Sequence, residues 1–253
     1  MKTIKHILSA TLTLVMFTSC SSDDDGGNQS LQTLLSKRIT STETISYNYD
    51  NNNRATGYIV DNISPENNYT TTFTYNSSGQ LAEVIYNPEN SIENIKVVYS
   101  YNNNGRISEI ETSYVYASGG LSSPISKYEA DYSTPGKVSV YKYTMAGTGT
   151  PYLNTEYYLD ANGNIENQLS YGTSGLLIVT TENSNYDDKK TASASLPDED
   201  FVRNVNNYGT VTVTATGGTP SVSTFTYEYN NDGYPIKRTS NTGSVVTYEY
   251  IKR

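Results

Sequence analysis

Apolar and polar side chains alternate along most of this chain, in short stretches separated by turn residues. Before the turns the apolar positions are largely aromatic, and they include Tyr47 and Tyr49, Phe73 and Tyr75, Tyr99 and Tyr101, and Phe225, Tyr227 and Tyr229. After the turns the alternation resumes, as in residues 80–86 and 106–111. A period of two is typical of a β-strand and places the rings on one face of a sheet. The pattern therefore predicts hairpins, each a strand, a tight turn and a returning strand.

The turns share a motif in which Gly follows Tyr by four residues. It occurs at residues 75–79, 101–105, 132–136 and 229–233. Three further copies are imperfect: Asn53 stands for the Gly after Tyr49, Leu159 for the Tyr before Gly163, and Lys190 for the Gly after Tyr186. Gly, and next Asn, adopts the left-handed conformation of a hairpin turn with the least strain. We therefore expect positive φ at these positions and a different turn at Lys190.

The repeats set the expected architecture. Their first residues are 26, 26, 31, 27, 27 and 43 residues apart, and the long step, residues 191–225, predicts an insertion or a degenerate extra hairpin. Two strands per repeat give roughly fourteen to sixteen strands, and no segment has a helical stripe. We predict an all-β, antiparallel up-and-down meander of repeated hairpins that curls into a half-barrel or a closed barrel. The last strand, near 248–250, would close it by pairing with residues 38–46.

Polar residues also bear on the solvent that surrounds the domain. Thr, Asn and Glu interrupt both faces of most expected strands. A transmembrane barrel needs strands of about ten residues with an apolar outer face. We therefore expect a water-soluble β domain.

The first 30 residues have a different character. Lys2 and Lys5 precede an apolar run, residues 7–17, and then small residues lead to Cys20, the only cysteine. This order resembles a signal peptide with the lipobox of bacterial lipoproteins. The resemblance implies that Cys20 is acylated and becomes the mature N-terminus, with residues 1–19 as signal peptide, 20–30 as an acidic flexible tether and 31–253 as one domain. Residues 22–25 resemble a signal for export to the cell surface in this group; the alternative is a plain tether on the periplasmic face.

Composition narrows the function classes. Without residues 1–19, 15 Lys and Arg residues face 26 Asp and Glu residues, a net charge of −11. Such a surface does not suit nucleic acid, which requires clustered basic residues. The only histidine, His6, lies in the leader, so a Ser–His or Cys–His nucleophile pair is excluded from the mature chain and zinc chemistry nearly so. We expect no cofactor, no bound metal and no catalytic residue, and a monomer that meets the membrane only through its lipid.

Two weaker possibilities concern oxygen-bearing side chains. A glycosidase needs a pair of carboxylates, and the candidates are Glu83, Glu109, Glu111, Glu156 and Glu166. Calcium could bind the turn 160–164 or the pair 187–188, although a hairpin turn explains the first better.

Two resemblances concern the β domain. The unit at residues 99–107, Tyr-Ser-Tyr-Asn-Asn-Asn-Gly-Arg-Ile, looks like the YD repeat of Rhs-type proteins, which build curling hairpin sheets. The lipobox, residues 186–190 and the closing segment 227–238 resemble a family of uncharacterised Bacteroidota lipoproteins with a porin-like β fold. This resemblance implies an outer-membrane lipoprotein and supplies no catalytic residues.

Three functions remain open. The first is a non-enzymatic, surface-exposed scaffold that binds a glycan or a partner protein, since tyrosine rings suit sugar stacking and interfaces. The second is a purely structural envelope protein, and the third a carboxylate enzyme acting on polysaccharide. Tyrosine repeated at fixed strand positions favours core packing over binding.

Overall fold

The computed structural model describes residues 31–143 and 149–253, and most of them are in strands. The β domain is a compact unit from Gln32 to Arg253. Its strands are β1 (Thr33–Ile39), β2 (Glu43–Tyr49), β3 (Ala55–Asn62), β4 (Tyr69–Tyr75), β5 (Leu81–Pro88), β6 (Asn94–Tyr101), β7 (Ile107–Val115), β8 (Ser126–Asp131), β9 (Lys137–Tyr143), β10 (Pro151–Leu159), β11 (Ile165–Tyr171), β12 (Leu177–Tyr186), β13 (Tyr208–Ala215), β14 (Ser221–Tyr229), β15 (Pro235–Ser240) and β16 (Val245–Lys252).

Helical structure in the described residues is limited to two short 3-10 helices, η1 (Pro65–Asn67) and η2 (Ala192–Ser195). No helix in this part of the chain is long and apolar enough to cross a membrane. The expected all-β class is confirmed. The predicted signal peptide, the tether and Cys20 lie outside the described residues.

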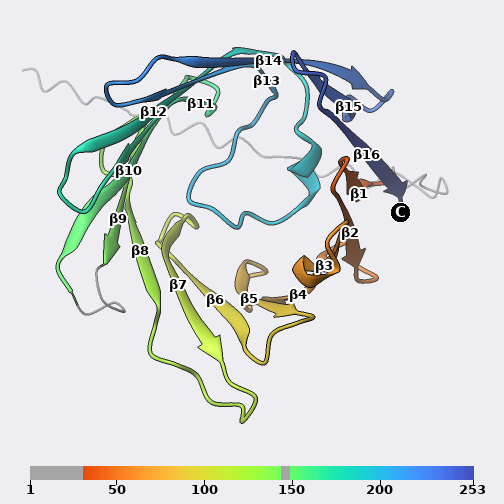
Figure 1. The fold of residues 1–253 in the computed structure, drawn as a ribbon. Coiled ribbons are helices and arrows are strands. Elements are labelled where there is room, and N and C mark those ends of the chain that lie inside the picture. Colours follow the sequence, from red (N-terminus) through yellow and green to blue (C-terminus); the bar gives the residue numbers. More distant parts are fainter. Residues whose placement is uncertain (1–30, 144–148) are drawn as a thin grey trace, which may run out of the picture. The chain divides into compact units, whose positions relative to one another are not determined.

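The strands form one closed antiparallel barrel (Figure 1). Each strand pairs with its neighbours in sequence, and β1 pairs with β16, which places Arg38 opposite Tyr248 and Leu35 opposite Tyr250. Closure removes the free edges that an open sheet would expose. The predicted pairing of the last strand with the first is confirmed, and of the two expected forms the domain has the closed one.

The turns with the Tyr-to-Gly motif share one rim, because alternate turns of an up-and-down barrel lie at the same end. Gly105 has a φ of 75° and Asn53 a φ of 62°, and the same conformation occurs at Gly79, Gly136, Gly163 and Gly233. In the turn 102–106, the Asn102 Oδ1 atom accepts the backbone N–H groups of Asn104 and Arg106 at 3.0 and 3.1 Å. The positive φ expected at these positions is therefore confirmed.

At most of the hairpins on this rim, a tyrosine hydroxyl near the end of one strand bonds to a backbone carbonyl of the preceding strand. Tyr101 donates its hydroxyl to the carbonyl of Leu81, the second residue after Gly79, at 2.7 Å. Equivalent bonds run from Tyr75 to Ala55, Tyr132 to Ile107, Tyr186 to Ile165 and Tyr250 to Pro235. A neutral hydrogen bond of this kind contributes about 1 kcal/mol. We call these five contacts the tyrosine ties; they are structural, as the repetition of the motif predicts.

The outer face of the barrel wall carries a series of lysine–glutamate ion pairs. Lys127 on β8 pairs with Glu109 on β7 at 2.7 Å and with Glu129 at 3.0 Å. Further ion pairs join Lys96 to Glu83, Lys137 to Glu156, Lys237 to Glu228 and Lys37 to Glu249. These residues alternate along their strands with the aromatic and aliphatic residues that face the lumen. The apolar face of the sheet is therefore the inner one.

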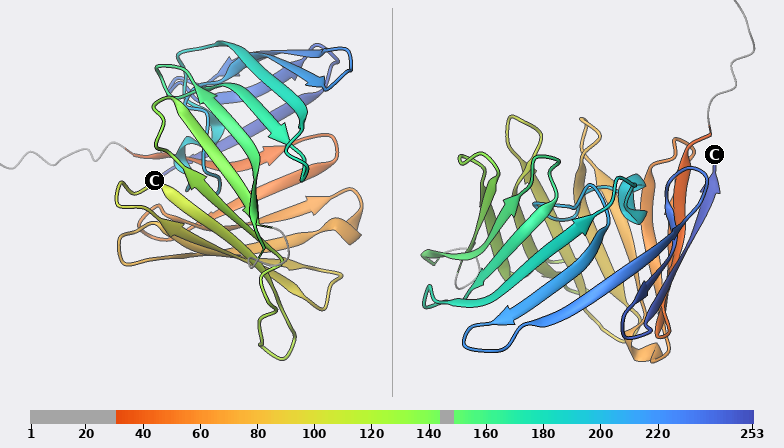
Figure 2. Two further views of the ribbon diagram at one scale, coloured as in Figure 1. Left: turned by 90° about the vertical axis from the view of Figure 1, so that its left-hand side faces the viewer. Right: turned by 90° about the horizontal axis from the view of Figure 1, so that it is seen from above.

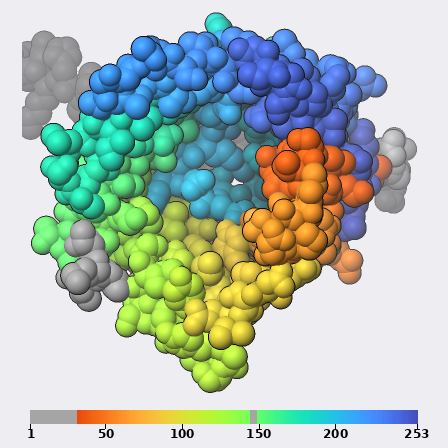
Figure 3. Space-filling view, in the orientation of Figure 1, coloured from red at the N-terminus to blue at the C-terminus, as the bar shows by residue number. Residues whose placement is uncertain are grey.

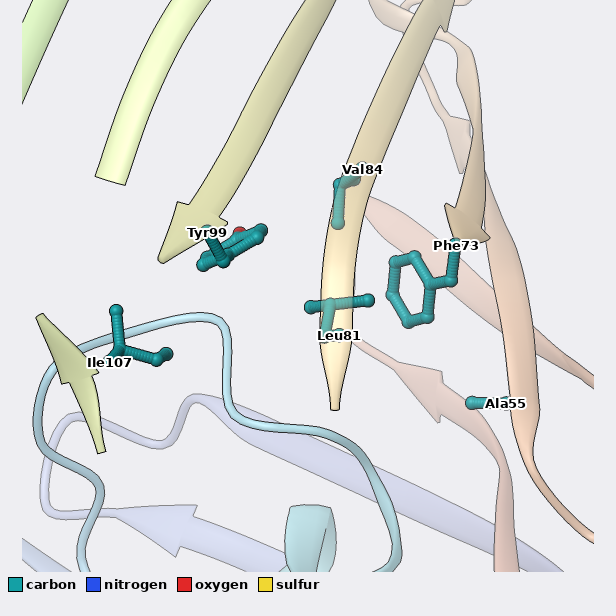
Figure 4. Packing of buried hydrophobic residues seen from close by; sticks show 6 residues of the cluster. All are labelled: Ala55, Phe73, Leu81, Val84, Tyr99 and Ile107. Carbon is teal, nitrogen blue, oxygen red and sulfur yellow. The ribbon is translucent and has the colours of Figure 1, made fainter. Parts of the chain in front are cut away.

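The most densely packed part of the inner face lies along β3 to β7. Its buried members are Ala55, Phe73, Leu81, Val84, Tyr99 and Ile107 (Figure 4). Leu196 and Phe201, which belong to the connection between β12 and β13, pack against this cluster from inside the barrel. The hydrophobic core is therefore an inner layer of the wall, completed by a segment of chain within the lumen.

Candidate functional site: the barrel lumen

The connection between β12 and β13 turns into the barrel and runs through its lumen. We call residues 187–207 the luminal segment; it carries η2 and is visible inside the ring of strands (Figures 1 and 3). Figure 2 shows that it enters near the rim at which β1 begins and β16 ends. It occupies part of the 43-residue step, so the expected insertion is confirmed, and the step still holds two strands, β13 and β14, as the other steps do. The Lys190 turn is indeed different, because here the chain leaves the wall.

A buried asparagine holds the C-terminal part of the luminal segment. Asn164, in the turn between β10 and β11, is 0% exposed. Its Oδ1 atom accepts the backbone N–H groups of Val205 and Asn206 at 3.0 and 2.8 Å. Nearby, the backbone N–H of Ile165 donates to the Asn204 Oδ1 atom at 2.8 Å. Five backbone and side-chain groups that water would otherwise satisfy are thus paired between the barrel wall and the luminal segment.

Contacts elsewhere hold the rest of the luminal segment. The Ser195 hydroxyl accepts the backbone N–H of Leu35 at 3.2 Å, and the Phe201 carbonyl accepts the hydroxyl of Tyr132 at 3.2 Å. The Arg203 guanidinium closes the segment on itself by donating to the carbonyls of Ser193 and Leu196. The segment therefore divides the lumen into separate spaces.

The larger space, which we call the acidic cavity, has a volume of about 520 Å³. It lies between the luminal segment and the wall formed by β5 to β10. Its lining residues are Tyr86, Val97, Tyr99, Ile110, Thr112, Tyr128, Val140, Asn154, Thr155, Tyr157, Glu199, Asp200 and Phe201. Aromatic rings and two carboxyl groups thus face the same space, and no lysine or arginine lines it.

Burial shifts the proton affinity of both carboxyl groups. Desolvation raises the pKa of Glu199 to about 7, although the Tyr86 hydroxyl, which donates to its Oε2 atom at 3.3 Å, opposes the shift. Burial and then the charge of Asp198 raise the pKa of Asp200, whose side chain reaches into the open lumen. The Tyr86 hydroxyl has its own pKa raised to about 12 by burial and by the Glu199 charge. At neutral pH Glu199 therefore exchanges between its acid and carboxylate forms.

A second space, the arginine cavity, lies between the luminal segment and the opposite part of the wall, β1, β2 and β13 to β16. Its volume is about 240 Å³, and its lining residues are Leu35, Arg38, Tyr47, Thr191, Ala192, Ser193, Asn204, Asn206, Asn207, Tyr208, Tyr227, Arg238 and Tyr248. The two cavities have opposite charge. Each is bounded on one side by the barrel wall and on the other by the luminal segment.

The barrel resembles solved structures of porin-like proteins. One, from Bacteroides vulgatus ATCC 8482, matches with a TM-score of 0.53 and 12% sequence identity, over 87% of this chain and 99% of that chain. Another, from Bacteroides uniformis ATCC 8492, matches with a TM-score of 0.38 and 12% identity, over 87% of this chain and 96% of that chain. No protein-family model and no curated protein matches this chain. The first likeness shows a shared porin-like fold, as the resemblance in the sequence implied.

The carboxylates that the sequence offers for a glycosidase pair do not meet in the lumen. Glu83, Glu109 and Glu156 lie on the outer face, each paired with a lysine. Glu111 lies on that face of β7 as well, opposite Lys127 on β8, and Glu166 is an exposed residue of β11. Their alternation with inward residues explains this, because the carboxylates occupy the solvated positions of their strands.

The calcium candidates are occupied by contacts within the protein. The Asp160 Oδ1 atom accepts hydrogen bonds from the backbone N–H groups of Asn162 and Asn164, both at 2.8 Å. These bonds are those of a hairpin turn, as the sequence favoured for residues 160–164. Asp187 accepts the hydroxyl of Tyr229, and Asp188 pairs with the neighbouring Lys189. Within residues 31–143 and 149–253, no three His, Cys, Asp or Glu residues are placed to share a metal ion.

The luminal carboxyl groups are the residues that the sequence analysis missed. Glu199 and Asp200 stand in the run Pro197-Asp-Glu-Asp-Phe201, within the one long step of the repeat. That run lacks the apolar–polar alternation and the turn motif found elsewhere. The sequence pattern therefore does not predict whether its side chains point into or out of the barrel. Its position in the longest interruption of a regular array was the available signal, because insertions between structural repeats are frequent carriers of function.

Proposed function

We propose that this chain is a non-enzymatic envelope protein whose barrel binds a small hydroxylated ligand, such as a glycan segment, in the acidic cavity. The observation that carries the proposal is the composition of that cavity. Tyr99, Tyr128 and Tyr157 offer flat rings against which a sugar can stack, while Glu199 and Asp200 offer acceptors for its hydroxyl groups. A concave space with aromatic walls and a few convergent polar groups is typical of a ligand site.

We propose further that the barrel stands in water. The outward residues include the lysine–glutamate pairs described above and the exposed Thr72 and Thr74 of β4. A barrel within a bilayer has the reverse arrangement, with an apolar outer band and a polar interior. The strands also have 6 to 10 residues, and most are shorter than the roughly 9–11 residues that a tilted membrane strand needs.

Attachment through Cys20 is the third part of the proposal. The lipobox resemblance supports it, and the tether, residues 20–30, would join the domain just before β1, beside the rim from which the luminal segment enters. The other rim would then be free to admit the ligand. An outer-membrane lipoprotein on the cell surface is the arrangement we favour, with the periplasmic face as the alternative, and a monomer is expected. Cys20→Ala should abolish acylation, as judged by loss of labelling with a fatty-acid analogue; continued labelling would refute this assignment.

A matched pair of tyrosines tests the ligand site. Tyr157 and Tyr158 are neighbours on β10, but Tyr157 lines the acidic cavity whereas Tyr158 lies on the outer face with Glu156. The purified protein, screened on a glycan array, should bind a defined set of glycans. Tyr157→Ala should weaken that binding at least about tenfold, as expected for loss of one stacked ring, and Tyr158→Ala should leave it unchanged. No binding on the array, together with no partner in surface pull-downs, would leave a structural envelope protein as the function.

A second candidate function rests on Glu199. Burial raises the pKa of Glu199 to about 7, and a second carboxyl group, Asp200, stands beside it. Glycosidases use a carboxylic acid with a raised pKa as the general acid, together with a second carboxyl group. If the protein hydrolyses a glycan that it binds, Glu199→Gln should abolish product formation while binding persists. Binding without hydrolysis by the wild-type protein selects the non-enzymatic function.

A further inference from the structure

The arginine cavity contains a guanidinium group with no ion-pair partner among the described residues. Arg38 is paired with Glu43, whose Oε1 atom lies 2.8 Å from its Nη1 atom. Arg238, on β15, has no carboxylate within ion-pairing distance in residues 31–143 and 149–253. The ring of Phe225 lies against its guanidinium group, with the ring centroid 5.0 Å from the Arg238 Cζ atom. The described residues therefore leave one positive charge in the cavity without a carboxylate partner.

The strand register brings the two arginines to the same place. Arg38 lies opposite Tyr248 on β16, and Arg238 lies opposite Val246 on the same strand. Arg38 and Arg238 thus flank β16 from its two sides, with Tyr248 between them on the inner face. Both side chains line the cavity, so the positive charge is directed into the lumen.

The remaining lining groups are rich in hydrogen-bond donors. Tyr47, Tyr227 and Tyr248 all have their pKa raised, chiefly by burial, so their hydroxyls stay protonated at neutral pH. The Tyr227 hydroxyl donates to the Tyr208 carbonyl at 3.1 Å, so Tyr47 and Tyr248 are the tyrosines whose hydroxyls can donate to a ligand. Asn204 and Ser193 of the luminal segment face them across the cavity. The carboxylate beside this group is Glu43, which is engaged by Arg38. A cavity with an unpaired guanidinium and several hydroxyl donors has the chemistry of an anion site.

We propose that the arginine cavity binds an anionic group, a carboxylate or a phosphate, carried by a small hydroxylated ligand such as a sugar. Arg238 is the charged donor, and the tyrosine hydroxyls bind the neutral part. The volume of about 240 Å³ has room for a single small ring or its equivalent. The site is separate from the acidic cavity, and neither proposal requires the other.

Three related probes test the site: glucose, glucuronate and glucose 6-phosphate, titrated into the full-length purified protein and followed by calorimetry at low salt. We expect at least one anionic sugar to bind about tenfold or more tightly than glucose, because a charged hydrogen bond is absent from the neutral probe. Glucuronate alone would identify a carboxylate ligand, and glucose 6-phosphate alone a phosphate. Equal affinity for all three probes, or no binding, overturns the proposal.

Two variants on β15 separate the site from general charge effects. Arg238→Gln should reduce anionic-sugar affinity by about tenfold or more, while Arg238→Lys should retain part of it. Lys237→Gln is the matched control, since Lys237 is the adjacent residue, carries the same charge and pairs with Glu228 on the outer face. Circular dichroism confirms that each variant is folded. If Arg238→Gln binds as the wild type does, or if Lys237→Gln loses as much affinity, the assignment is wrong. Tyr157→Ala should not affect these titrations, which distinguishes this site from the acidic cavity.

Discussion

Two connections at the same rim of this barrel show how a repeat array acquires a site. Between β6 and β7 the chain reverses within residues 102–106, with Gly105 at positive φ and Tyr101 tied to Leu81. Between β12 and β13 the equivalent connection has Lys190 at the Gly position, and the chain instead makes the luminal segment. Tyr186 keeps its tie to Ile165 even so. The wall thus tolerates a long insertion because the tie, and the pairing of β12 with β13, persist on either side of it.

The regular hairpin and the luminal segment are stabilised differently. The hairpin relies on local turn geometry and on one hydrogen bond to its neighbour. The luminal segment relies on side chains distant in sequence, above all Asn164, and it carries the buried acidic group Glu199. Mutations should therefore cost most where the luminal segment is attached and least at a single tie.

The largest effect is expected at Asn164. Asn164→Ala removes the acceptor of two backbone N–H groups and leaves both unpaired, which should lower the free energy of unfolding by about 3 kcal/mol. Urea unfolding measures the change. The control is Asn162→Ala in the same turn, where the exposed side chain makes no comparable bond and the cost should be under about 0.5 kcal/mol. Equal losses in the two variants would contradict a special role for Asn164.

The next effect concerns Glu199 and depends on pH. Its pKa in the folded protein, about 7, lies above the unfolded value, so the folded state holds this proton more tightly. Folding stability attributable to this group is highest below the unfolded pKa and declines as pH rises through about 7. Glu199→Gln should raise the free energy of unfolding by about 2 kcal/mol at pH 8 and change it little at pH 5. A stability difference that is the same at both pH values would refute the raised pKa.

An intermediate effect is expected at the regular turns. Gly105→Ala places a Cβ atom on a residue with a φ of 75°, which should cost about 1–2 kcal/mol. Gly120→Ala is the matched control, because that glycine does not have positive φ and a Cβ atom there has room. Thermal unfolding of the two variants should therefore differ, with the Gly105 variant melting lower. Similar melting temperatures would show that the turn does not need Gly.

The smallest effect is expected for a single tyrosine tie. Tyr101→Phe removes only the hydroxyl that bonds the Leu81 carbonyl and should cost about 1 kcal/mol. Tyr116→Phe, at a tyrosine that is 42% exposed, should cost close to nothing. If Tyr101→Phe lowered the free energy of unfolding as much as Asn164→Ala does, the predicted difference between local and long-range attachment would be wrong.

The comparison also shows which features could be predicted. The turn at residues 101–105 could be predicted from the sequence, because a residue with positive φ is usually Gly or Asn and here lies at a fixed distance from the end of a strand. Leu159 is instructive: it replaces the motif tyrosine and has no hydroxyl to donate, yet β10 and β11 form an ordinary hairpin there. Strand pairing therefore does not require the tie. The luminal position of Glu199 could not be predicted, because nothing local in Pro197-Asp-Glu-Asp-Phe201 specifies the direction in which the chain leaves the wall.

By itself the sequence determined the strands, their antiparallel order and the conformation of the turns, because these depend on neighbours within a few residues. It also predicted that the chain has no histidine once residues 1–19 are removed. The tertiary structure alone decided that the sheet forms a closed barrel and not a half-barrel, that the aromatic face turns inward, and that the luminal segment separates an acidic cavity from one containing arginine. Those outcomes depend on contacts between residues far apart in the chain, such as Asn164 with Asn206 and Arg38 with Tyr248, and alternation along a strand does not encode which partner lies across the lumen.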